Sequence, residues 1–371
     1  MARLGFDLFC RVVDNFGDIG VCWRLARQLA AMPQQHTVRL WVDDLSTFAR
    51  IEPAVAPTLD RQTIRGVDIV AWNDASASLA PQEIVVEAFA CDPPAAFMQQ
   101  ARQRDSLCVN LEYLSAEPWV ASCHGLPSLQ ANGLRKVFFF PGFTTDTGGL
   151  LREPDLLAIR DAYRADPGQR AALLATVGLP TAQIATLLEG GRQVLLFGYS
   201  HAPANALRQV LAQQQQPSVV LVPSGVCPDL SRGAYGQTYV HDMPFVDQDG
   251  FDRLLWTSDL NCIRGEDSLV RALWAGKPLL WHIYPQEDGA HMQKLQAWLA
   301  LSPFEGIAGP LMRCWNDGDP SAVIPLLRKA MDNPDWAQWQ GAAADWCAQL
   351  ARQNDLATTL AEYCAQNRRK G

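Results

Sequence analysis

The sequence lacks the features that mark membrane, secreted and metal-binding proteins. It has no apolar run of ~18 residues, the length that a membrane-spanning helix needs. Its opening residues, MARLGFDLFC, do not form a signal peptide with a small-residue cleavage site. The 10 cysteines are scattered without a CxxC pair, and the 6 histidines are dispersed. We therefore expect a cytoplasmic protein with buried free thiols and no resident metal.

A surplus of positive charge is also missing. The formal net charge is −8 and the pI is near 5.3, whereas a nucleic-acid-binding protein usually carries a basic patch or stripe. The charge balance argues against nucleic acid as a partner, and the missing apolar run argues against a membrane. What is present is ordinary for a globular protein, with 48% hydrophobic and 19% charged residues. A chain of 371 residues is too long for one small core, so we expect about two domains.

Short apolar runs alternate with helical patterns in the first half of the chain. Helices are predicted over residues 19–31 and 94–104. Strands are predicted over residues 6–13, 37–42, 67–72, 83–89, 107–113 and 136–143. Continuous apolar strands separated by helices are typical of a parallel sheet that is covered on both faces.

The alternation stops at a Gly- and Thr-rich segment, 144–153, and then restarts. Further strands are predicted over residues 194–200, 218–224, 238–245, 260–265 and 278–284, with helices near 203–215, 249–257 and 268–275, and helices again from 287 onward. The pattern predicts an α/β protein with two doubly wound, Rossmann-like domains, 1–150 and 151–354, that face a cleft. The C-terminal helix, 355–371, can pack back on the first domain.

Ligands of such sheets bind beyond the carboxyl ends of the strands, and two loops lie there. The first, DNFGDIG, contains Asp14 and Asp18, while Gly17 and Gly20 allow a tight turn. It is not the GxGxxG fingerprint, and its carboxylates would repel a pyrophosphate, so an NAD-linked oxidoreductase is disfavoured. Asp18 is a good match to the N-cap of the helix 19–31. Two acids are more than a cap requires, and catalysis is the alternative reason for them.

The second loop lies in the stretch IRGEDSLVRALWAGKPLLW. A helix that begins behind Gly265 offers free N–H groups and the positive end of its dipole to phosphate oxygens. Arg264 adds a planar cationic donor, and Asp267 or Ser268 is predicted to cap the helix. Glu266 would orient Arg264 or bind sugar hydroxyls. The whole stretch indicates a site for a nucleotide-sugar diphosphate.

Aromatic residues near the same edge are candidates for binding the base. Phe245 and Phe251 would hold a planar base between them, and Gln248 would hydrogen-bond its edge. The alternative is that both phenylalanines belong to the core. Tyr199 ends a predicted strand and would reach the same site.

At these loops the sequence resembles a known family. The stretches DLFCRVVDNFGDIGVCWRLARQLA, PGFTTDTGGLLRE and RGEDSLVRALWAGKPLLWHIYPQEDGAHMQKL are similar to the EarP family of bacterial protein-arginine rhamnosyltransferases. The resemblance covers essentially the entire chain. It implies a GT-B glycosyltransferase fold with dTDP-β-L-rhamnose as donor and no cofactor. It also implies that the acceptor is one arginine of translation elongation factor P, which this modification activates to relieve ribosome stalling at polyproline. Transfer would invert the anomeric centre without a metal, because the helix N-terminus and Arg264 suit the negative charge that grows on the leaving diphosphate.

The resemblance also implies roles for individual residues. The family's catalytic aspartate matches Asp18, and its partner acid matches Glu266. The family's donor contacts match Asp14, Asn15, Phe16, Gly17, Tyr199, Phe245, Gln248, Phe251, Arg264, Gly265, Glu266, Asp267 and Ser268.

The chemistry of arginine explains why an acid is needed. A guanidinium keeps its proton up to a pKa above ~12, and an ordinary aspartate, with a pKa near ~3.9, does not remove that proton before attack. An aspartate can align one nitrogen and accept the proton as the C–N bond forms. Two alternatives remain open: another GT-B transferase with a different donor or acceptor, and a module that binds a sugar nucleotide without turnover.

Overall fold

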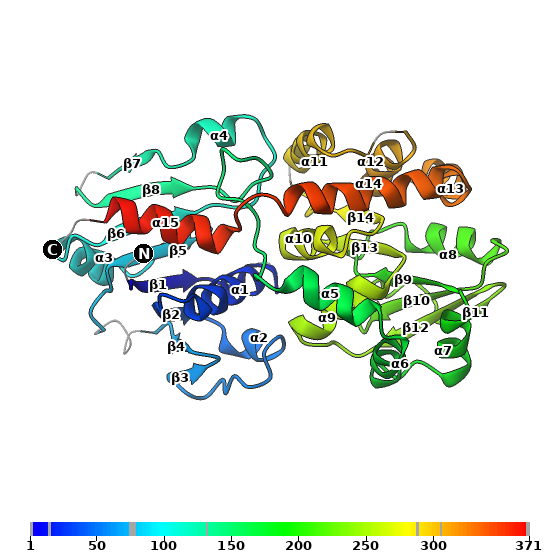
Figure 1. Ribbon diagram of the computed structural model, residues 1–371, viewed down its shortest axis with the longest axis horizontal. Coiled ribbons are helices and arrows are strands. Elements are labelled where there is room, and N and C mark those ends of the chain that lie inside the picture. The colour runs from blue at the N-terminus through cyan, green and yellow to red at the C-terminus, as the bar shows by residue number, and fades with distance from the viewer. Residues whose placement is uncertain are drawn as a thin grey trace. The chain divides into compact units, whose positions relative to one another are not determined.

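The structure is a computed structural model that describes residues 3–13, 16–73, 79–130, 133–286, 289–304 and 306–368. The chain divides into two compact units. The first unit consists of Met1–Glu153 together with Gln353–Gly371, and the second is Pro154–Arg352. The last part of the chain therefore belongs to the same unit as its first part (Figure 1).

A mostly parallel sheet forms the centre of the first unit. Among the described residues its strand order is β3-β4-β2-β1-β5-β6-β8-β7. The strands are β1 (Gly5–Cys10), β2 (Thr37–Val42), β3 (Arg61–Ile64), β4 (Val67–Ala71), β5 (Ile84–Ala88), β6 (Leu107–Leu111), β7 (Pro127–Leu129) and β8 (Arg135–Phe139). The predicted parallel sheet is confirmed from β4 to β8, and the short edge strands β3 and β7 add antiparallel pairs that the sequence analysis did not predict.

Helices cover both faces of this sheet because successive strand residues point to opposite sides. Leu8 packs in one core with α1 (Gly17–Ala31) and α15 (Leu356–Asn367), whereas the next residue, Phe9, packs in another with α3 (Ala95–Gln103). The shorter helices α2 (Leu45–Ala49) and α4 (Trp119–Cys123) complete the unit. Phe9 stacks on Trp41 with ring centroids 4.9 Å apart, so aromatic packing reinforces the second core.

The Gly-rich segment before the second unit receives the returning chain. Gly149 has a φ of +79°, and a Cβ there would lie 2.5 Å from the backbone oxygen of Asn354. Only glycine combines this conformation with such a close approach. The Leu356 N–H then donates to the Leu150 carbonyl at 3.0 Å, and Gln28 of α1 bonds to Asp355 at 2.6 Å. The glycine therefore has a structural role, which is to dock α15 on the first unit.

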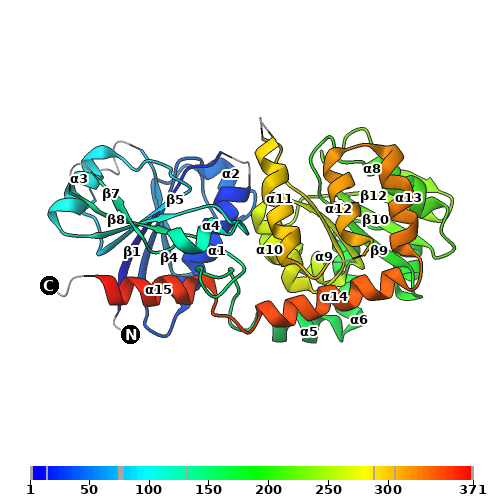
Figure 2. The same cartoon turned by 90° about the horizontal axis from the view of Figure 1, so that it is seen from above.

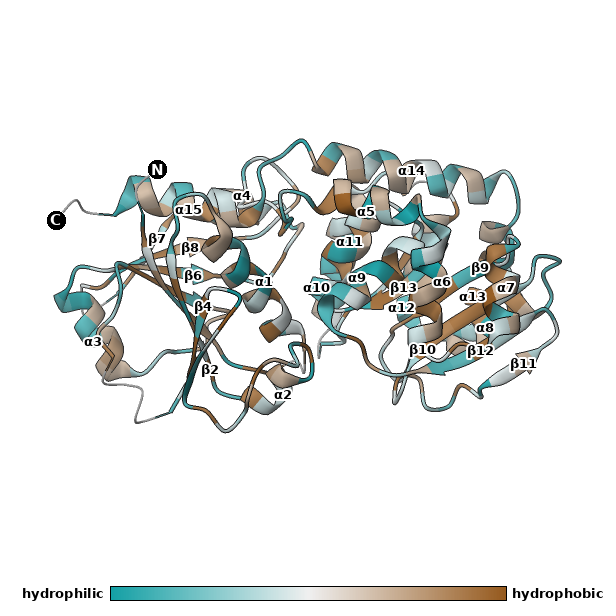
Figure 3. Cartoon of the chain, turned by 60° about the horizontal axis from the view of Figure 1, so that its bottom comes forward, coloured by the Kyte–Doolittle hydropathy of each residue, from teal (hydrophilic) through white to brown (hydrophobic). Residues whose placement is uncertain are grey.

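The second unit repeats the α/β pattern with a smaller sheet. Its order among the described residues is β11-β12-β10-β9-β13-β14, with β11 antiparallel at one edge and the others parallel. The strands are β9 (Arg192–Leu196), β10 (Ser218–Pro223), β11 (Gly233–Tyr235), β12 (Thr238–Met243), β13 (Leu260–Arg264) and β14 (Leu279–His282). Their apolar character is visible as brown ribbon in Figure 3.

The helices of the second unit surround this sheet (Figure 2). They are α5 (Leu156–Arg164), α6 (Pro167–Thr176), α7 (Thr181–Leu188), α8 (Ala204–Ala212), α9 (Gln248–Thr257), α10 (Glu266–Ala275), α11 (Ala290–Leu301), α12 (Ala308–Asp317), α13 (Pro320–Met331) and α14 (Asp335–Leu350). Helices α8, α9 and α10 contact β10, β9 and β13 respectively, as expected for a doubly wound fold. The prediction that the two domains face a cleft stays a prediction.

The structure can be compared with the expectations of free, buried cysteines and of no membrane-spanning helix. All cysteines are free, and all are buried except Cys123 and Cys314, which are half-buried. Within the described part of the chain, no helix has both the length and the apolar character needed to cross a membrane.

The packing of α15 generates a stability prediction. Leu360 of α15 is fully buried in the core of the first unit, so Leu360→Ala should lower the free energy of unfolding by about 2–5 kcal/mol. Denaturant unfolding measures the loss, and amide hydrogen exchange should show it in β1, β5 and β6 rather than in β9 to β14. The control is Leu188→Ala, which removes a leucine that is 45% exposed and should change stability by less than about 0.5 kcal/mol. Equal loss of protection in both sheets would contradict the assignment of α15 to the first unit.

Candidate functional site

The carboxyl edge of the second sheet gathers most of the residues that the sequence analysis selected in this unit. Strands β9 and β13 are neighbours in its centre, and the segments that follow them carry Phe197, Tyr199 and Glu266. The Phe197 N–H donates to the Cys262 carbonyl at 2.7 Å, so this residue is still held by the adjacent strand. The edge is therefore a direct continuation of the two central strands.

Three phenylalanines form a half-buried cluster at this edge. The ring of Phe197 lies 5.4 Å from that of Phe251 and 6.5 Å from that of Phe245, edge to face in both cases. None of the three is fully buried, and the alternative that Phe245 and Phe251 have only a packing role stays open. Exposed aromatic surface of this kind suits stacking on a planar base.

Arg264, the last residue of β13, packs against the aromatic rings of the segment that follows β9. Its guanidinium carbon is 4.6 Å from the ring centre of Phe197 and 4.9 Å from that of Tyr199. One guanidinium nitrogen also donates to the Gly198 carbonyl at 3.4 Å. Cation–π contacts with two rings fix the direction of the guanidinium while it stays half-exposed. Arg264 can therefore meet an anion with its orientation already set.

The helix that follows Arg264 begins two residues earlier than it would with Asp267 as its N-cap. We predicted that Asp267 or Ser268 caps it, and this prediction is wrong: α10 begins at Glu266, and Gly265 is the N-cap with a φ of 69°. Glycine takes this conformation freely, so β13 turns into α10 without an intervening loop. The Gly265 carbonyl accepts a hydrogen bond from the Trp281 indole at 2.9 Å. The residues Glu266, Asp267 and Ser268 thus form the first turn, where backbone N–H groups and the helix dipole favour an anion.

A buried ion pair joins this helix to the one that carries Phe251. Arg271 of α10 donates to both carboxylate oxygens of Asp252 in α9, at 3.0 and 2.6 Å, and both side chains are buried. Bidentate geometry fixes orientation as well as distance. At the start of α9, Asp247 accepts from the Gly250 N–H at 2.8 Å, and Gln248 is buried. The Asp252–Arg271 pair therefore fixes the position of α9, and with it Phe251, relative to α10.

Asp18 lies in the first unit, where it does not cap its helix. The N-cap of α1 is Phe16, the helix begins at Gly17, and Asp18 follows in the first turn, so the N-cap prediction is wrong. Its Oδ2 instead accepts the backbone N–H of Val13 at 2.9 Å, and the side chain is only 3% exposed. Burial raises the pKa of the Cys22 thiol, and the nearby Asp18 charge adds to that shift. Asp18 is thus a buried, oriented carboxylate at the start of a helix, where negative charge is favoured.

A second carboxylate holds the same loop. Asp43, which follows β2, accepts the Val12 N–H at 2.9 Å. Asp14 and Asn15, which the sequence analysis also selected, lie outside the described residues.

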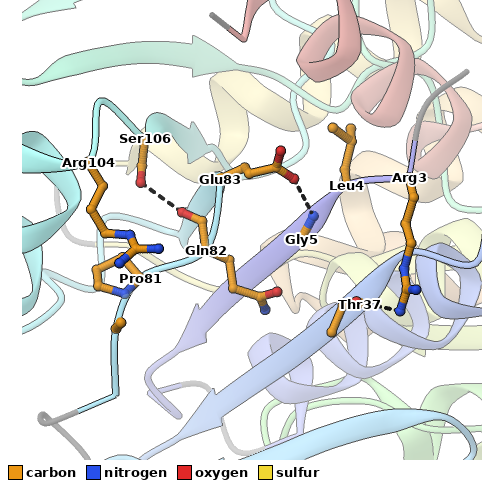
Figure 4. Close-up of a pocket in the computed structure, with 10 residues that line it drawn as sticks. Arg3, Leu4, Gly5, Thr37, Pro81, Gln82, Glu83, Arg104 and Ser106 are labelled. Atoms are coloured by element: carbon orange, nitrogen blue, oxygen red, sulfur yellow. Dashed lines mark hydrogen bonds between the residues drawn. The ribbon is translucent and has the colours of Figure 1, made fainter. Parts of the chain in front are cut away.

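Two pockets among the described residues are lined by residues other than these. One, of about 500 Å³, is lined at the amino ends of the first sheet's strands by residues that include Arg3, Gln82 and Arg104 (Figure 4). Ligands of α/β sheets bind at the opposite, carboxyl end. The other, of about 310 Å³, is lined by Ser200, His201 and residues of α8, directly after Tyr199.

The described residues contain no group of three or more His, Cys, Asp or Glu side chains that could hold a metal ion. The groups of the second unit that could meet an anion are instead the backbone N–H groups at the start of α10 and the Arg264 guanidinium.

The sequence analysis missed Phe197 and the Asp252–Arg271 pair. Phe197 lies two residues before Tyr199 in the same predicted strand end, so the position of Tyr199 was a usable signal for it. No local signal marks Asp252 and Arg271 as partners, because their contact depends on how α9 and α10 pack.

Comparisons with known proteins agree on one family. The model of the family described as "Elongation-Factor P (EF-P) rhamnosyltransferase EarP" matches residues 6–365. A protein-arginine rhamnosyltransferase of Pseudomonas putida is 45% identical over 96% of this chain and 98% of the relative. One from Neisseria meningitidis is 36% identical over 78% of this chain and 77% of the relative.

Solved structures extend the comparison to the fold. A structure that describes EarP-mediated arginine glycosylation of translation elongation factor EF-P is 33% identical, with a TM-score of 0.64 over 98% of this chain and 100% of that chain. The glycosyltransferase VinC in complex with dTDP has a TM-score of 0.52 at 12% identity and covers 98% of this chain and 99% of that one. The latter likeness concerns the fold alone. The predicted GT-B fold is confirmed.

The aromatic cluster generates a binding prediction. If the Phe251 ring stacks on a base, Phe251→Ala should weaken binding of dTDP by about 1–3 kcal/mol, the scale of base–aromatic stacking. Calorimetry on the folded variant measures the change. Phe138→Ala, which removes a half-buried ring from β8 of the first unit, is the control and should leave dTDP affinity unaltered. Unchanged affinity in a folded Phe251→Ala variant would return Phe251 to a packing role.

Proposed function

Because this chain belongs to the EarP family of protein-arginine rhamnosyltransferases, we propose that it transfers rhamnose from dTDP-β-L-rhamnose to one arginine of elongation factor P. We infer inversion at the anomeric carbon and no need for a metal or other cofactor. The acceptor that a relative's structure names is translation elongation factor EF-P. A factor that serves the ribosome would meet this enzyme in the cytoplasm.

The observation that carries the donor proposal is the grouping of three kinds of contact at one sheet edge. The cluster of Phe197, Phe245 and Phe251 suits thymine, whose ring is planar and apolar on its faces. Arg264 and the first turn of α10 suit the diphosphate, since both offer N–H donors and positive charge. These groups stabilise the negative charge that grows on the leaving dTDP, and that stabilisation needs no metal.

The acceptor nitrogen needs a partner because a guanidinium is a poor nucleophile. Attack forms a bond from an arginine nitrogen to C1 of rhamnose, while the bond from C1 to the diphosphate oxygen breaks and dTDP leaves. The nitrogen becomes more acidic as its bond to carbon forms, and the Asp18 carboxylate accepts the released proton. Its burial and its bond to the Val13 N–H support this role, because both keep the carboxylate in one orientation.

Glu266 and Asp14 have supporting roles in this proposal. The transition state carries positive charge at the sugar ring, and a carboxylate in the first turn of α10 stabilises that charge or orients the acceptor guanidinium. Asp14, which lies outside the described residues, is proposed to help shape either the loop or the acceptor pocket. The two catalytic acids of the proposal are therefore Asp18 in the first unit and Glu266 in the second.

One experiment separates this proposal from its alternatives. Elongation factor P is incubated with the protein and dTDP-β-L-rhamnose and then measured by mass spectrometry. The expected result is a gain of one deoxyhexose on one arginine. No gain, with modification by another nucleotide sugar, would favour a GT-B transferase with a different donor. Binding of dTDP-rhamnose without any transfer would favour a binding module.

Metal independence is a separate prediction. Since Arg264 and the N–H groups of α10 meet the diphosphate, extraction with EDTA should leave the initial rate of transfer unchanged. Added magnesium should not raise it. Loss of activity in EDTA with recovery on magnesium addition would overturn this part of the proposal.

Asp18→Asn tests the catalytic role. The amide oxygen of asparagine still accepts the Val13 N–H, so the fold should hold, and loss of the charge from the first turn of α1 should cost only about 0.3–1 kcal/mol. Transfer should fall by at least ~10²-fold, the low end of what a positioned base contributes, while dTDP affinity stays unchanged. The measurement is single-turnover modification at saturating donor, with melting temperature in parallel.

The matched control is Asp43→Asn. This carboxylate accepts the neighbouring Val12 N–H at 2.9 Å, so the variant makes the same chemical change in the same loop. It should retain transfer within about threefold, the range expected for one altered neutral hydrogen bond. Near-normal turnover by Asp18→Asn would show that Asp18 only anchors the loop, and the base would then be sought at Asp14 or Glu266.

A further inference from the structure

His282 is a fully buried histidine behind the donor edge of the second sheet. It ends β14 and lies beside Arg264 in the parallel register of β13 and β14. The mechanism above gives it no role. Its position at a strand's carboxyl end nevertheless places it one strand away from the residues proposed to bind the diphosphate.

One nitrogen of His282 holds the segment that carries the donor contacts. The Tyr199 backbone N–H donates to its Nδ1 at 3.3 Å, and the two rings meet edge to face at 5.4 Å. The same short segment is held at Phe197 by β13 and at the Gly198 carbonyl by Arg264. His282 thus supplies the last of three successive attachments, beyond the point where β9 ends.

The charge of His282 suits this location. Burial lowers its pKa to about 3, with further lowering by His201, Arg264 and His291. The ring is therefore neutral at physiological pH and does not repel Arg264. A neutral imidazole that accepts at Nδ1 carries its proton on Nε2, and this buried Nε2 has no hydrogen-bond partner among the described residues. Among the described residues, the bond at Nδ1 is therefore the hydrogen bond that the imidazole makes.

We propose that His282 is a positioning residue for the donor: its Nδ1 fixes the Phe197–Tyr199 segment, and through it the two aromatic rings on which Arg264 lies. This inference rests on the proposed function of the edge as a donor site. The two ring contacts of Arg264, at 4.6 and 4.9 Å, mean that movement of this segment moves the guanidinium as well. Loss of the hydrogen bond to Tyr199 should therefore weaken donor binding. This loss of affinity should be larger than expected from the loss of folding stability alone.

A matched histidine allows this role to be separated from ordinary packing. His36 in the first unit is also buried, and its Nδ1 accepts the Leu4 N–H at 3.0 Å. Its Nε2 likewise has no partner among the described residues. His36 lies before β2, at the amino end of the first sheet. His36→Gln thus removes an equivalent hydrogen bond in the other unit.

The test compares three single variants of the full chain. His282→Asn keeps an acceptor near the position of Nδ1, whereas His282→Gln moves the amide to the position of Nε2. We expect His282→Gln to raise the Kd of dTDP and the KM of dTDP-rhamnose about tenfold, the scale of one lost hydrogen bond. His282→Asn should stay within about threefold of the wild type, and His36→Gln should lower the melting temperature without changing either constant. Equal Kd values for the Asn and Gln variants at position 282 would overturn the proposal, as would an equal effect of His36→Gln.

A measurement on the wild-type protein keeps the proposal testable if a variant fails to fold. Nitrogen-15 NMR of labelled histidine should show His282 with its proton on Nε2 and an unprotonated Nδ1, and the Nδ1 signal should shift when dTDP is added. A proton on Nδ1 would rule out the bond to Tyr199 and with it the proposal. If the wild type binds no dTDP, the donor assignment fails, and the variants are then compared with whichever of UDP, GDP or ADP the wild type binds.

Discussion

The turn at Gly265 is the constraint on which the proposed donor site of the second unit depends. Its φ of 69° is open to glycine and costly for other residues. Because the chain turns there from β13 directly into α10, the last strand residue is Arg264 and the first helical N–H groups follow at once. The Trp281 indole secures the Gly265 carbonyl from the adjacent strand. The backbone geometry at Gly265 thus keeps the Arg264 side chain next to the N-terminus of α10.

An acidic chain must concentrate positive potential locally if it is to bind the anionic donor that we propose. The net charge of −8 offers no general attraction, so the second unit uses oriented N–H groups, one arginine and neutral neighbours. Arg264 lies on two aromatic rings, and the buried imidazole beside it carries no charge. The acids Glu266 and Asp267 occupy the same first turn, where carboxylates suit the positive charge of a sugar transition state. In the proposed mechanism, the opposite charges of the diphosphate and the sugar ring explain why N–H groups and carboxylates are adjacent.

Much of the fold was predictable because buried parallel strands leave a strong local signal. The strand predicted at 37–42 agrees with β2 at both ends, and that predicted at 218–224 extends one residue beyond β10. The edge strands β3 and β7 were missed because short strands with exposed residues, such as Leu129 at 94% exposure, lack a continuous apolar run. Helix starts were less predictable. Asp18 was expected at an N-cap, yet its carboxylate bonds to Val13, five residues earlier, and that partner depends on the path of the chain after β1.

The sequence by itself determined the α/β class, the two-unit pattern and the two loops that carry the candidate chemistry, because strand periodicity, glycines and charged residues are local properties. Only the tertiary structure decided how those residues work together. It brought Phe197 to Phe251, paired Asp252 with Arg271 and placed His282 against Tyr199, residues separated in the chain by 19 to 83 positions. Such contacts arise when neighbouring strands and helices pack, and no short stretch of sequence contains both partners.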